Sequence, residues 1–481
     1  MKNLLILLLV VPILGFTQQN TISDNLFLNY ETYKESIITQ RRFKHNEIQP
    51  LIEKLKPEKD FQVTFLGNSI EGRSISMISI GSGTTNVLLW SQMHGDETTA
   101  TMAIFDIFNY LKVNKEILKN IKLHFIPMLN PDGAEKFTRR NAIGIDINRD
   151  AIRLQSPESR ILKSARDSLK ADFGFNLHDQ GRDYSVGNSF NPASISFLAP
   201  SPDYEKSITA PREKAMKLIG NMVNVLNEFI PGHIAKYSDD YEPRAFGDNF
   251  TKWGTGVVLL ESGGWRGDRE KQFLREINYI AILSALSSIV SNSYVNTDLS
   301  IYESIPHNEK FMMDFILRNL ILNRDGKEYI IDIGINFEEV NINGARDFYL
   351  KASIEDLGDL SVYSGYDEID LSGYIIEPGK TKPEAYNSLD DLEKIIPVEL
   401  YKQGYTNVLL SDGEFSGEYS NLPFNIIIDG KNELNGLIKP DAAANFIIRK
   451  NDEVKYVIVN GFLIDIEKVN DWSGNTIVYR K

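Results

Sequence analysis

Short apolar strands alternate with helices across residues 62–291, and this alternation restricts the fold of the chain more than any other feature. The predicted strands are residues 62–66, 74–80, 87–90, 122–129, 173–177 and 256–260, and the predicted helices are residues 98–111, 157–170, 211–229 and 268–291. Alternation of this kind predicts an α/β domain with a mixed, mostly parallel sheet flanked by helices. The preceding residues 19–60 are predicted to be helical.

The sequence changes character near residue 296. Strand-like runs are separated there by Asp-Gly, Asn-Gly and Pro-Gly turns, at residues 329–335, 347–354, 424–428, 444–449 and 455–459. This pattern is typical of a mostly β region. We therefore expect the α/β domain to cover residues 18–295 and a smaller, mostly β accessory region to cover residues 296–481, with a candidate split into two parts near residue 385.

The N-terminus and the composition narrow the class of protein. Residues 1–17 read as a secretory signal peptide, because Lys2 precedes an apolar run that is too short to cross a membrane. The chain has no cysteine, which excludes disulfides, thiol catalysis and cysteine-ligated metal. Its net charge of −14 argues against a nucleic-acid partner. We expect a secreted or periplasmic protein without a membrane span, and the sequence leaves its oligomeric state open.

Residues with metal-binding chemistry follow two of the predicted strands. His94 and Glu97 come directly after strand 87–90, and His178 closes strand 173–177. In open α/β sheets, ligands bind beyond the carboxyl ends of the strands, so we expect these three side chains to meet. Zinc favours such nitrogen and oxygen donors, and a catalytic zinc needs only three protein ligands. The sequence therefore predicts one Zn²⁺ ion at this edge.

A carboxylate and several guanidinium groups are expected near the same edge. Glu261 ends strand 256–260, where it can act as a general base beside a metal-bound water, or instead cap a helix or form a salt bridge. Arg139 and Arg149 lie in a loop-like stretch that can equally be solvated. Guanidinium groups bind carboxylates bidentately and stabilise developing oxyanions. This set suits hydrolysis of an amide next to a free carboxylate.

Seven short motifs occur between residues 60 and 265 in a characteristic order. They are Glu71-Gly-Arg73, His94-Gly-Asp-Glu97, Asn130-Pro-Asp-Gly133, Arg139-x-Asn141, Gly144-Ile-Asp-Ile-Asn148-Arg149, Asn176-Leu-His178 and Leu260-Glu261. In these motifs and their order the chain resembles the zinc metallocarboxypeptidases of the carboxypeptidase A-like group. The resemblance implies a zinc-dependent exopeptidase that hydrolyses the C-terminal peptide bond of peptides, with a metal-activated water and a glutamate general base.

The resemblance also implies a role for each matched residue. Beside the three zinc ligands, Glu261 would be the general base, Arg139 would polarise the scissile carbonyl, Asn148 and Arg149 would bind the terminal carboxylate, Asp146 would orient His94, and Arg73 would line a more distant subsite. A tyrosine on a loop over the pocket is expected too, and Tyr241 is favoured over Tyr237. Asp248, near the expected specificity pocket, can recognise a basic side chain or cap a turn.

Two other functions stay open. A zinc amidase on the same core would act on cell-wall peptides or small acylated amino acids, because the pair Asn148 and Arg149 fits any substrate with a carboxylate there. A non-catalytic binding protein on the same core is the second alternative, although the complete metal-donor set with Glu261 and Arg139 argues against it. The expected partner is therefore a peptide or small amide with a free carboxylate.

Overall fold

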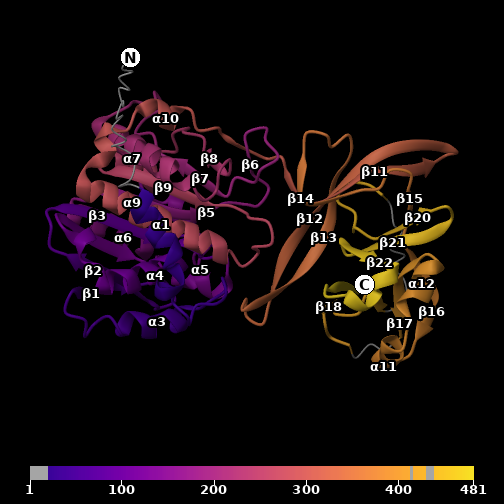
Figure 1. Cartoon of the computed structure of the whole chain (residues 1–481). Helices are drawn as coiled ribbons and strands as arrows, with labels where there is room; N and C mark the ends of the chain where they lie inside the picture. Colours follow the sequence, from indigo (N-terminus) through magenta and orange to yellow (C-terminus); the bar gives the residue numbers. More distant parts are fainter. Residues whose placement is uncertain (1–19, 412–414, 429–437, 481) are drawn as a thin grey trace, which may run out of the picture.

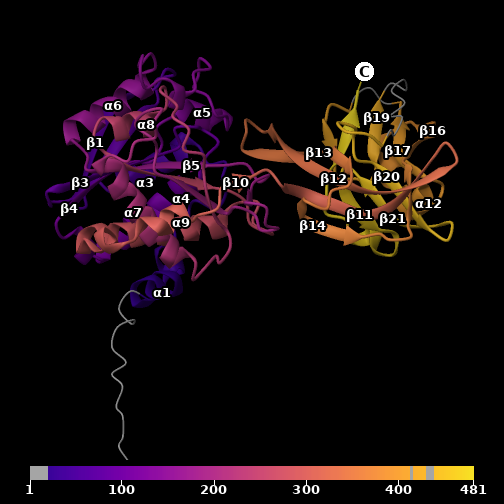
Figure 2. The ribbon, with the colours of Figure 1, turned by 90° about the horizontal axis from the view of Figure 1, so that it is seen from above.

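The computed structural model describes residues 20–411, 415–428 and 438–480 of the chain. The signal peptide predicted at residues 1–17 lies outside these ranges. The chain forms an α/β unit at its N-terminal side and a β-rich unit at its C-terminal side, which lie next to each other in Figures 1 and 2. The N-terminal unit contains every residue that the sequence nominates for the site, so its sheet is described first.

A mixed eight-stranded sheet forms the centre of the N-terminal unit. Its strands are β1 Phe61–Asn68, β2 Ser74–Gly81, β3 Thr85–Ser91, β4 Ile121–Ile126, β5 Phe173–Asp179, β7 Ile195–Leu198, β8 Ile234–Lys236 and β9 Gly256–Ser262. They follow the order β1-β2-β4-β3-β5-β9-β7-β8. The central strands β4, β3, β5 and β9 run parallel, whereas β2 and β7 pair antiparallel with their central neighbours. The predicted mixed, mostly parallel α/β sheet is therefore confirmed.

Helices cover both faces of this sheet. They are α1 Asn20–Leu28, α2 Tyr30–Tyr33, α3 His45–Glu53, α4 Thr99–Val113, α5 Pro131–Lys136, α6 Pro157–Leu169, α7 Ala210–Leu226, α8 Phe246–Lys252, α9 Gln272–Ser291 and α10 Leu299–Glu303, with short 3-10 turns η1 Glu116–Leu118, η2 Ile147–Arg149 and η3 Ser293–Asn296. Successive residues of β3 point to opposite faces. Val87 and Leu89 therefore pack with α4, α7 and α9, whereas Leu88 and Trp90 pack with α6 and α8.

The longer predicted elements are present, and the differences are local. The four predicted helices correspond to α4, α6, α7 and α9, and α6 begins at Pro157 with Ser156 as its N-cap, whose side chain accepts the N–H of Ser159. Helix α5 begins at Pro131 after the N-cap Asn130, and the strand predicted at residues 122–129 ends at residue 126. Of the segment predicted to be helical, residues 20–60 contain three short helices, with irregular backbone over residues 34–44.

Helix α9 is long and apolar enough to cross a membrane, with a mean hydropathy of 1.4. Of this stretch, 78% is buried inside the protein, against α4 and α7 among others. A core helix passes the same test of length and composition. We interpret α9 as such a core helix, because its apolar side chains are already covered by the elements around it.

Two sheets make up the C-terminal unit. The first contains β11 Met312–Arg324, β12 Lys327–Ile342, β13 Asp347–Gly358, β14 Ser364–Asp370, β15 Ile375–Pro378, β20 Phe446–Lys450, β21 Glu453–Val459 and β22 Phe462–Asp465. The second contains β16 Lys380–Tyr386, β17 Tyr405–Leu410, β18 Tyr419–Ser420, β19 Asn425–Ile428 and β23 Thr476–Tyr479, next to α11 Leu389–Glu393, α12 Pro397–Lys402 and η4 Ile466–Asp471. Their orders are β13-β12-β11-β15-β20-β21-β22, with β14 beside β11, and β16-β17-β19-β23-β18.

The boundary between the two units lies after residue 295, where the sequence analysis placed it. Helix α10 packs on α7, and the hydroxyl of Tyr302 accepts the backbone N–H of Ala199 at 3.0 Å. The two-stranded sheet of β6 Ser185–Val186 and β10 Asn308–Glu309 also belongs to the N-terminal unit. The first unit thus extends to β10. The expected split near residue 385 falls at β16, after which β20 to β22 return to the first C-terminal sheet.

Candidate functional site

Two of the expected metal donors lie on the turn between β3 and α4. His94 Nδ1 is 2.7 Å from Glu97 Oε1, and both side chains are buried. Gly95 packs so closely on Gly133 that a Cβ atom at position 95 would overlap the backbone of its neighbour. The N–H of Gly95 donates to the carbonyl of Thr138 at 3.0 Å. The turn that carries the donors is therefore fixed against the segment around α5.

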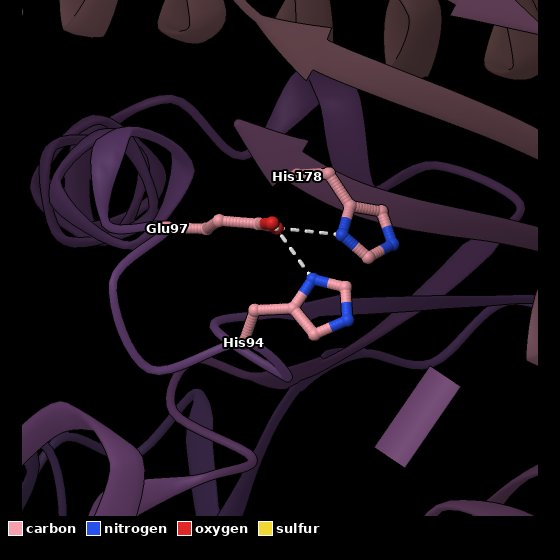
Figure 3. Close-up of side chains that lie close together, drawn as sticks. All are labelled: His94, Glu97 and His178. Carbon is pink, nitrogen blue, oxygen red and sulfur yellow. Dashed lines mark hydrogen bonds and ion pairs between the residues drawn. The ribbon is translucent and has the colours of Figure 1, made fainter. Parts of the chain in front are cut away.

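The third donor comes from β5. His178 Nδ1 lies 2.7 Å from Glu97 Oε2, so the carboxylate stands between the two imidazole rings, as Figure 3 shows. The ring centroids of His94 and His178 are 4.9 Å apart. One ligand atom from each of the three residues lies within 4.8 Å of the other two. The three side chains therefore converge, as the sequence predicted from the strand ends.

The donor set fits a zinc ion. Two imidazole nitrogens and a carboxylate oxygen are the ligands that zinc takes in catalytic sites. Metal-bound histidines commonly donate their other ring nitrogen to a carboxylate, and His94 Nε2 lies 3.2 Å from Asp146 Oδ1. His178 Nε2 is buried without a hydrogen-bond partner among the described residues. The polar atoms of His178 are thus satisfied on the side of the donor cluster only.

The electrostatics of the cluster favour a cation. Although burial opposes it, the negative charge of Glu97 and hydrogen bonds to Asp146 and Glu97 raise the pKa of His94 to about 9. Burial also opposes the ionisation of Glu97 and Asp146. His94 and His178 nevertheless hold the pKa of Glu97 below its usual range, and His94 and Arg139 do the same for the pKa of Asp146. Burial lowers the pKa of His178. The negative charges of Glu97 and Asp146 that favour protonated His94 would also favour a divalent metal ion.

Glu261 lies beside the donors on the neighbouring strand. In the parallel register of β5 and β9, Glu261 pairs with His178. The side chain is half-buried, and no hydrogen bond or ion pair joins it to another described residue. Burial, and then the negative charge of Glu97, raise the pKa of Glu261 well above its ordinary value. An unpaired carboxylate with a raised pKa at a cluster of metal donors is suited to proton transfer.

Arg139 contacts the same cluster from the loop after α5. Its Nε donates to Asp146 Oδ2 at 3.0 Å, and its Nη1 lies 3.1 Å from His94 Nδ1 and 3.4 Å from Glu97 Oε1. The side chain is 42% exposed. The structure therefore brings Arg139 and Asp146 together with the predicted metal donors.

Asn148 and Arg149 follow Asp146 on η2. The N–H of Phe246 donates to Asn148 Oδ1 at 2.9 Å, which fixes the orientation of that amide. Arg149 Nη1 donates to the carbonyl of Asn148 at 2.8 Å, and its Nε is 3.3 Å from Glu242 Oε2. Arg149 also lines a cavity of about 470 Å³ together with Asp146. Arg149 thus borders a polar cavity next to the cluster, and the role of Asn148 and Arg149 as a carboxylate-binding pair stays a prediction.

Arg73 is engaged with acidic residues at one side of the site. Its Nη1 donates to Asp132 Oδ1 and to Glu71 Oε2, each at 2.7 Å. Asp132 also accepts the hydroxyl of Ser69 at 2.7 Å, so this network holds the loop before β2 on α5. Within the described residues, no hydrogen bond or ion pair joins Arg73 to the metal donors, and its subsite role stays a prediction.

Tyr237 lies nearer to the cluster than Tyr241. The ring of Tyr241 packs on Tyr204 with centroids 4.9 Å apart, and both line a separate cavity of about 630 Å³. Tyr237 instead lies with its hydroxyl 3.3 Å from that of Tyr184. Burial raises the pKa of Tyr237, and the charge of Glu261 adds to this rise, which places the two side chains close together. These contacts favour Tyr237 over Tyr241 as the tyrosine at the site.

An ion pair behind the donors was missed from the sequence. Asp179 follows His178 directly, and its Oδ2 accepts the hydroxyl of Thr99 at 2.7 Å and lies 3.2 Å from Lys271 Nζ. Lys271 also donates to the carbonyl of Ser262 at 2.8 Å. This buried pair joins the ends of β5 and β9, which carry a donor and Glu261. The sequence signal for this pair was an acidic residue, Asp179, directly after a metal ligand. Its partner Lys271 lies in a distant loop and shows no signal of this kind.

Comparison with known proteins agrees with this geometry. Residues 49–228 match the family described as zinc carboxypeptidase, a stretch that includes the three metal donors and Arg139 but ends before Glu261. Carboxypeptidase B from Astacus astacus is 24% identical over 170 residues, which cover 33% of this chain and 50% of that protein. The probable carboxypeptidase 2 of Trichophyton verrucosum is 25% identical over 138 residues, or 26% of each chain.

The solved metallo-carboxypeptidase from Burkholderia cenocepacia is 16% identical and aligns with 52% of this chain and 70% of that one, at a TM-score of 0.42. The chain spans half or less of the length of the curated relatives it matches. The matched segment carries the two histidines and the glutamate that meet at the carboxyl edge of the sheet. Residues 49–228 of the N-terminal unit therefore match the zinc carboxypeptidase family in sequence, and the three metal donors and the sheet agree with this match.

Proposed function

We propose that the chain is a zinc-dependent carboxypeptidase that hydrolyses the C-terminal peptide bond of its substrate. One observation carries this proposal: Glu261 pairs with His178 across β5 and β9, so a carboxylate with a raised pKa stands next to the complete set of metal donors. The match of residues 49–228 to the zinc carboxypeptidase family supports a peptide substrate. The proposed reaction needs one zinc ion, one general base and a cationic environment.

Each group would act at a defined stage of the hydrolysis. A zinc ion held by His94, Glu97 and His178 would polarise the scissile carbonyl and lower the pKa of the attacking water. Glu261 accepts a proton from that water and then donates it to the leaving amine. Burial raises the pKa of Glu261 above that of an ordinary carboxyl group, which makes it a better proton acceptor when it is ionised.

The arginines would bind the negative charges of the substrate. Arg139 donates hydrogen bonds to the oxygen of the scissile carbonyl as negative charge develops there. Arg149, together with the amide nitrogen of Asn148, binds the terminal carboxylate. The amide of Asn148 is already oriented by the N–H of Phe246, and its Nδ2 has no partner in the described part of the chain. This pre-orientation lowers the cost of binding a carboxylate.

A zinc amidase for small substrates is the second candidate, and the position of the C-terminal unit favours it. The hydroxyl of Tyr366 in β14 donates to the carbonyl of Arg182 at 3.0 Å, and the Tyr366 side chain lies against Gly264. These two contacts fall directly after the strands that carry His178 and Glu261. A wall at this place would favour short acylated amino acids over long peptides. The ratio of kcat/KM for acyl-dipeptides and decapeptides with the same terminal residue separates the two candidates.

The Glu261→Gln variant tests the proposed mechanism. It keeps the size of the side chain but removes the base, so we expect stoichiometric zinc and a loss of roughly a thousandfold in kcat. Glu276→Gln is the matched control, because burial also raises the pKa of Glu276, to about 7, in α9. Release of free amino acids from a peptide library is followed by liquid chromatography, with and without a chelator. A zinc-loaded wild-type protein that releases none would refute the proposal.

A further inference from the structure

The hairpin of β12 and β13 extends from the C-terminal unit to α5 of the N-terminal unit (Figures 1 and 2). Its turn, residues 343–346, contains three successive residues with positive φ, between 51° and 66°. The carbonyl of Ala345 at this turn accepts a hydrogen bond from Lys44 Nζ at 2.9 Å. Lys44 is buried and also donates to the carbonyl of Glu135 in α5 at 2.7 Å. The hairpin turn therefore shares a buried cation with α5.

Arg42 joins the hairpin to the residue that follows α5. Its Cζ lies 4.1 Å from the ring centroid of Phe137 and 4.1 Å from that of Phe348, so one ring of each unit stacks on the guanidinium. Arg42 Nη2 donates to Glu339 at 2.8 Å and to Asn341 at 3.2 Å. Cation–π contacts are strongest when the cation is desolvated, and Arg42 is only 4% exposed. This stack is a firm link between the two units.

A second link holds the same position through the backbone. Asn341 Nδ2 of the hairpin donates to the carbonyls of Lys136 and Phe137, at 3.3 and 3.4 Å. Phe137 ends α5 in the left-handed conformation, with φ 48° and ψ 58°. This conformation costs energy for a residue other than glycine and persists where the surroundings impose it. Asn341 of the hairpin therefore holds the backbone of Phe137 directly, and Phe348 of the hairpin reaches its ring through Arg42.

Phe137 is two residues from Arg139, and the intervening backbone is held by the donor turn. The carbonyl of Thr138 accepts the N–H of Gly95, between the donors His94 and Glu97, at 3.0 Å. The carbonyl of Arg139 lies 3.4 Å from Asn130 Nδ2. Residues 137–139 thus run between two anchors, the hairpin on one side and the donor turn on the other. Loss of one anchor would free this segment.

We propose that the β12–β13 hairpin positions Arg139, and that Arg42 and Phe348 are the positioning residues through which it acts. The guanidinium of Arg139 stabilises charge only from a defined place, whereas its long side chain is partly exposed and flexible. Fixing the backbone at Phe137 restricts where that guanidinium can reach. The C-terminal unit is by this inference part of the working active site. The expected effect on catalysis rests on the proposed function, whereas the expected effect on the backbone of residues 137–139 does not.

The Phe348→Ala variant of the full chain tests this proposal, with Tyr329→Ala as the matched control. Tyr329 is an exposed aromatic residue at the opposite end of β12. For Phe348→Ala we expect full zinc occupancy, kcat lower by roughly tenfold and a KM changed by less than about twofold. Amide hydrogen exchange should become faster in residues 133–141 and stay unchanged in Tyr329→Ala. Arg42→Lys, which keeps the charge but loses the planar stack, should resemble Phe348→Ala.

A double variant asks whether the hairpin acts through Arg139. In an Arg139→Ala background, Phe348→Ala should cause no further loss of kcat. An equal loss in both backgrounds, or unchanged exchange in residues 133–141, would overturn the proposal. Should Phe348→Ala fail to fold, Asn341→Ala removes the backbone link and one acceptor of Arg42 but keeps the Phe348 ring, and it should reproduce the faster exchange. If the wild-type protein proves inactive, the proposed function fails, while the exchange comparison still decides whether the hairpin holds this segment.

Discussion

Single residues in this site take their properties from their neighbours. His94, Glu97 and His178 share two hydrogen bonds of 2.7 Å, and Asp146 and Arg139 surround them. The acids keep their charge despite burial because each faces a histidine or an arginine. Glu261 lacks such a partner, and its pKa rises instead. The same edge of one sheet therefore holds two kinds of carboxyl group. Glu97 and Asp146 have lowered pKa values and are suited to bind a cation, whereas Glu261 has a raised pKa and is suited to carry a proton.

Asp248 gives a prediction for the pH dependence of stability. Its Oδ1 accepts the N–H of Glu242 at 3.0 Å, so it caps a turn, one of the two roles the sequence allowed. Burial, with the nearby charge of Glu242, raises its pKa to about 7. The folded protein then binds more protons than the unfolded chain between about pH 4 and 7. The contribution of Asp248 to stability is therefore present below about pH 4 and is lost as the pH rises to 7.

We expect Asp248→Asn to remove this loss, because asparagine stays neutral and can still accept the hydrogen bond. At pH 8 the variant should have a free energy of unfolding higher by about 4 kcal/mol, and at about pH 3 the two proteins should be nearly equal. Urea unfolding at both pH values measures the difference. An equal change at the two pH values would mean that the carboxyl does not titrate as described.

The metal donors were predictable from the sequence, whereas their surroundings were not. His178 and Glu261 each close an apolar strand, and neighbouring parallel strands bring their carboxyl ends together. The tyrosine lies on an irregular loop, where spacing does not determine which side chain faces the site, so Tyr241 was favoured although the contacts favour Tyr237. The ion pair of Asp179 and Lys271 joins two distant segments and has no local signal.

At the scale of elements, long periodic segments were predictable and short ones were not. Helices α4, α6, α7 and α9 have 13 or more residues, enough for several turns of apolar periodicity. Helix α5 has six residues and begins with Asn130 and Pro131, which indicate a turn as well as an N-cap. Strands β7 and β8 have four and three residues, too few to show alternation. Their place in the sheet depends on tertiary pairing, of β7 with β9 and of β8 with β7.

The N-terminal segment, residues 20–44, is attached to the core by a buried ion pair. Arg275 Nη2 in α9 is 2.5 Å from Asp106 Oδ1 in α4, and both side chains are fully buried. Arg275 also donates to the carbonyl of Ile38, and Asp106 accepts the hydroxyl of Tyr30 at 3.0 Å. We infer that this segment belongs to the folded unit, since its backbone supplies acceptors to a buried guanidinium.

The Arg275→Met variant tests this attachment. It leaves Asp106 buried without its cation, so we expect a loss of about 3–5 kcal/mol in the free energy of unfolding and rapid proteolysis within residues 20–44. The double variant Arg275→Met with Asp106→Leu removes both charges and should lose less. Chemical unfolding and limited proteolysis measure the two effects. A variant that unfolds like the wild type with an uncleaved N-terminus would contradict the inference.

At the scale of the whole molecule, the chain combines separate hydrophobic cores with a polar contact between them. The N-terminal core contains residues up to Ile305, and the clusters of the C-terminal sheets begin at Met313. The contact between the units is largely ionic: Glu339 of the hairpin lies within 3.4 Å of Arg41, Arg42 and Arg269. Interfaces of this kind resemble those between transiently associated proteins. The two units should therefore unfold as separate transitions.

Removal of the metal should then affect one transition alone. Every metal donor lies in the N-terminal unit, and the last histidine of the chain is His307. Zinc at a hundred times its dissociation constant stabilises the folded unit by about 2.7 kcal/mol, so chelation should lower one calorimetric transition by roughly 5–10 °C. The Arg275→Met variant identifies that transition, because it destabilises the same unit. A single transition whose midpoint temperature rises with zinc would contradict this prediction. It would mean that the contacts of Glu339 couple the two units more strongly than their separate cores suggest.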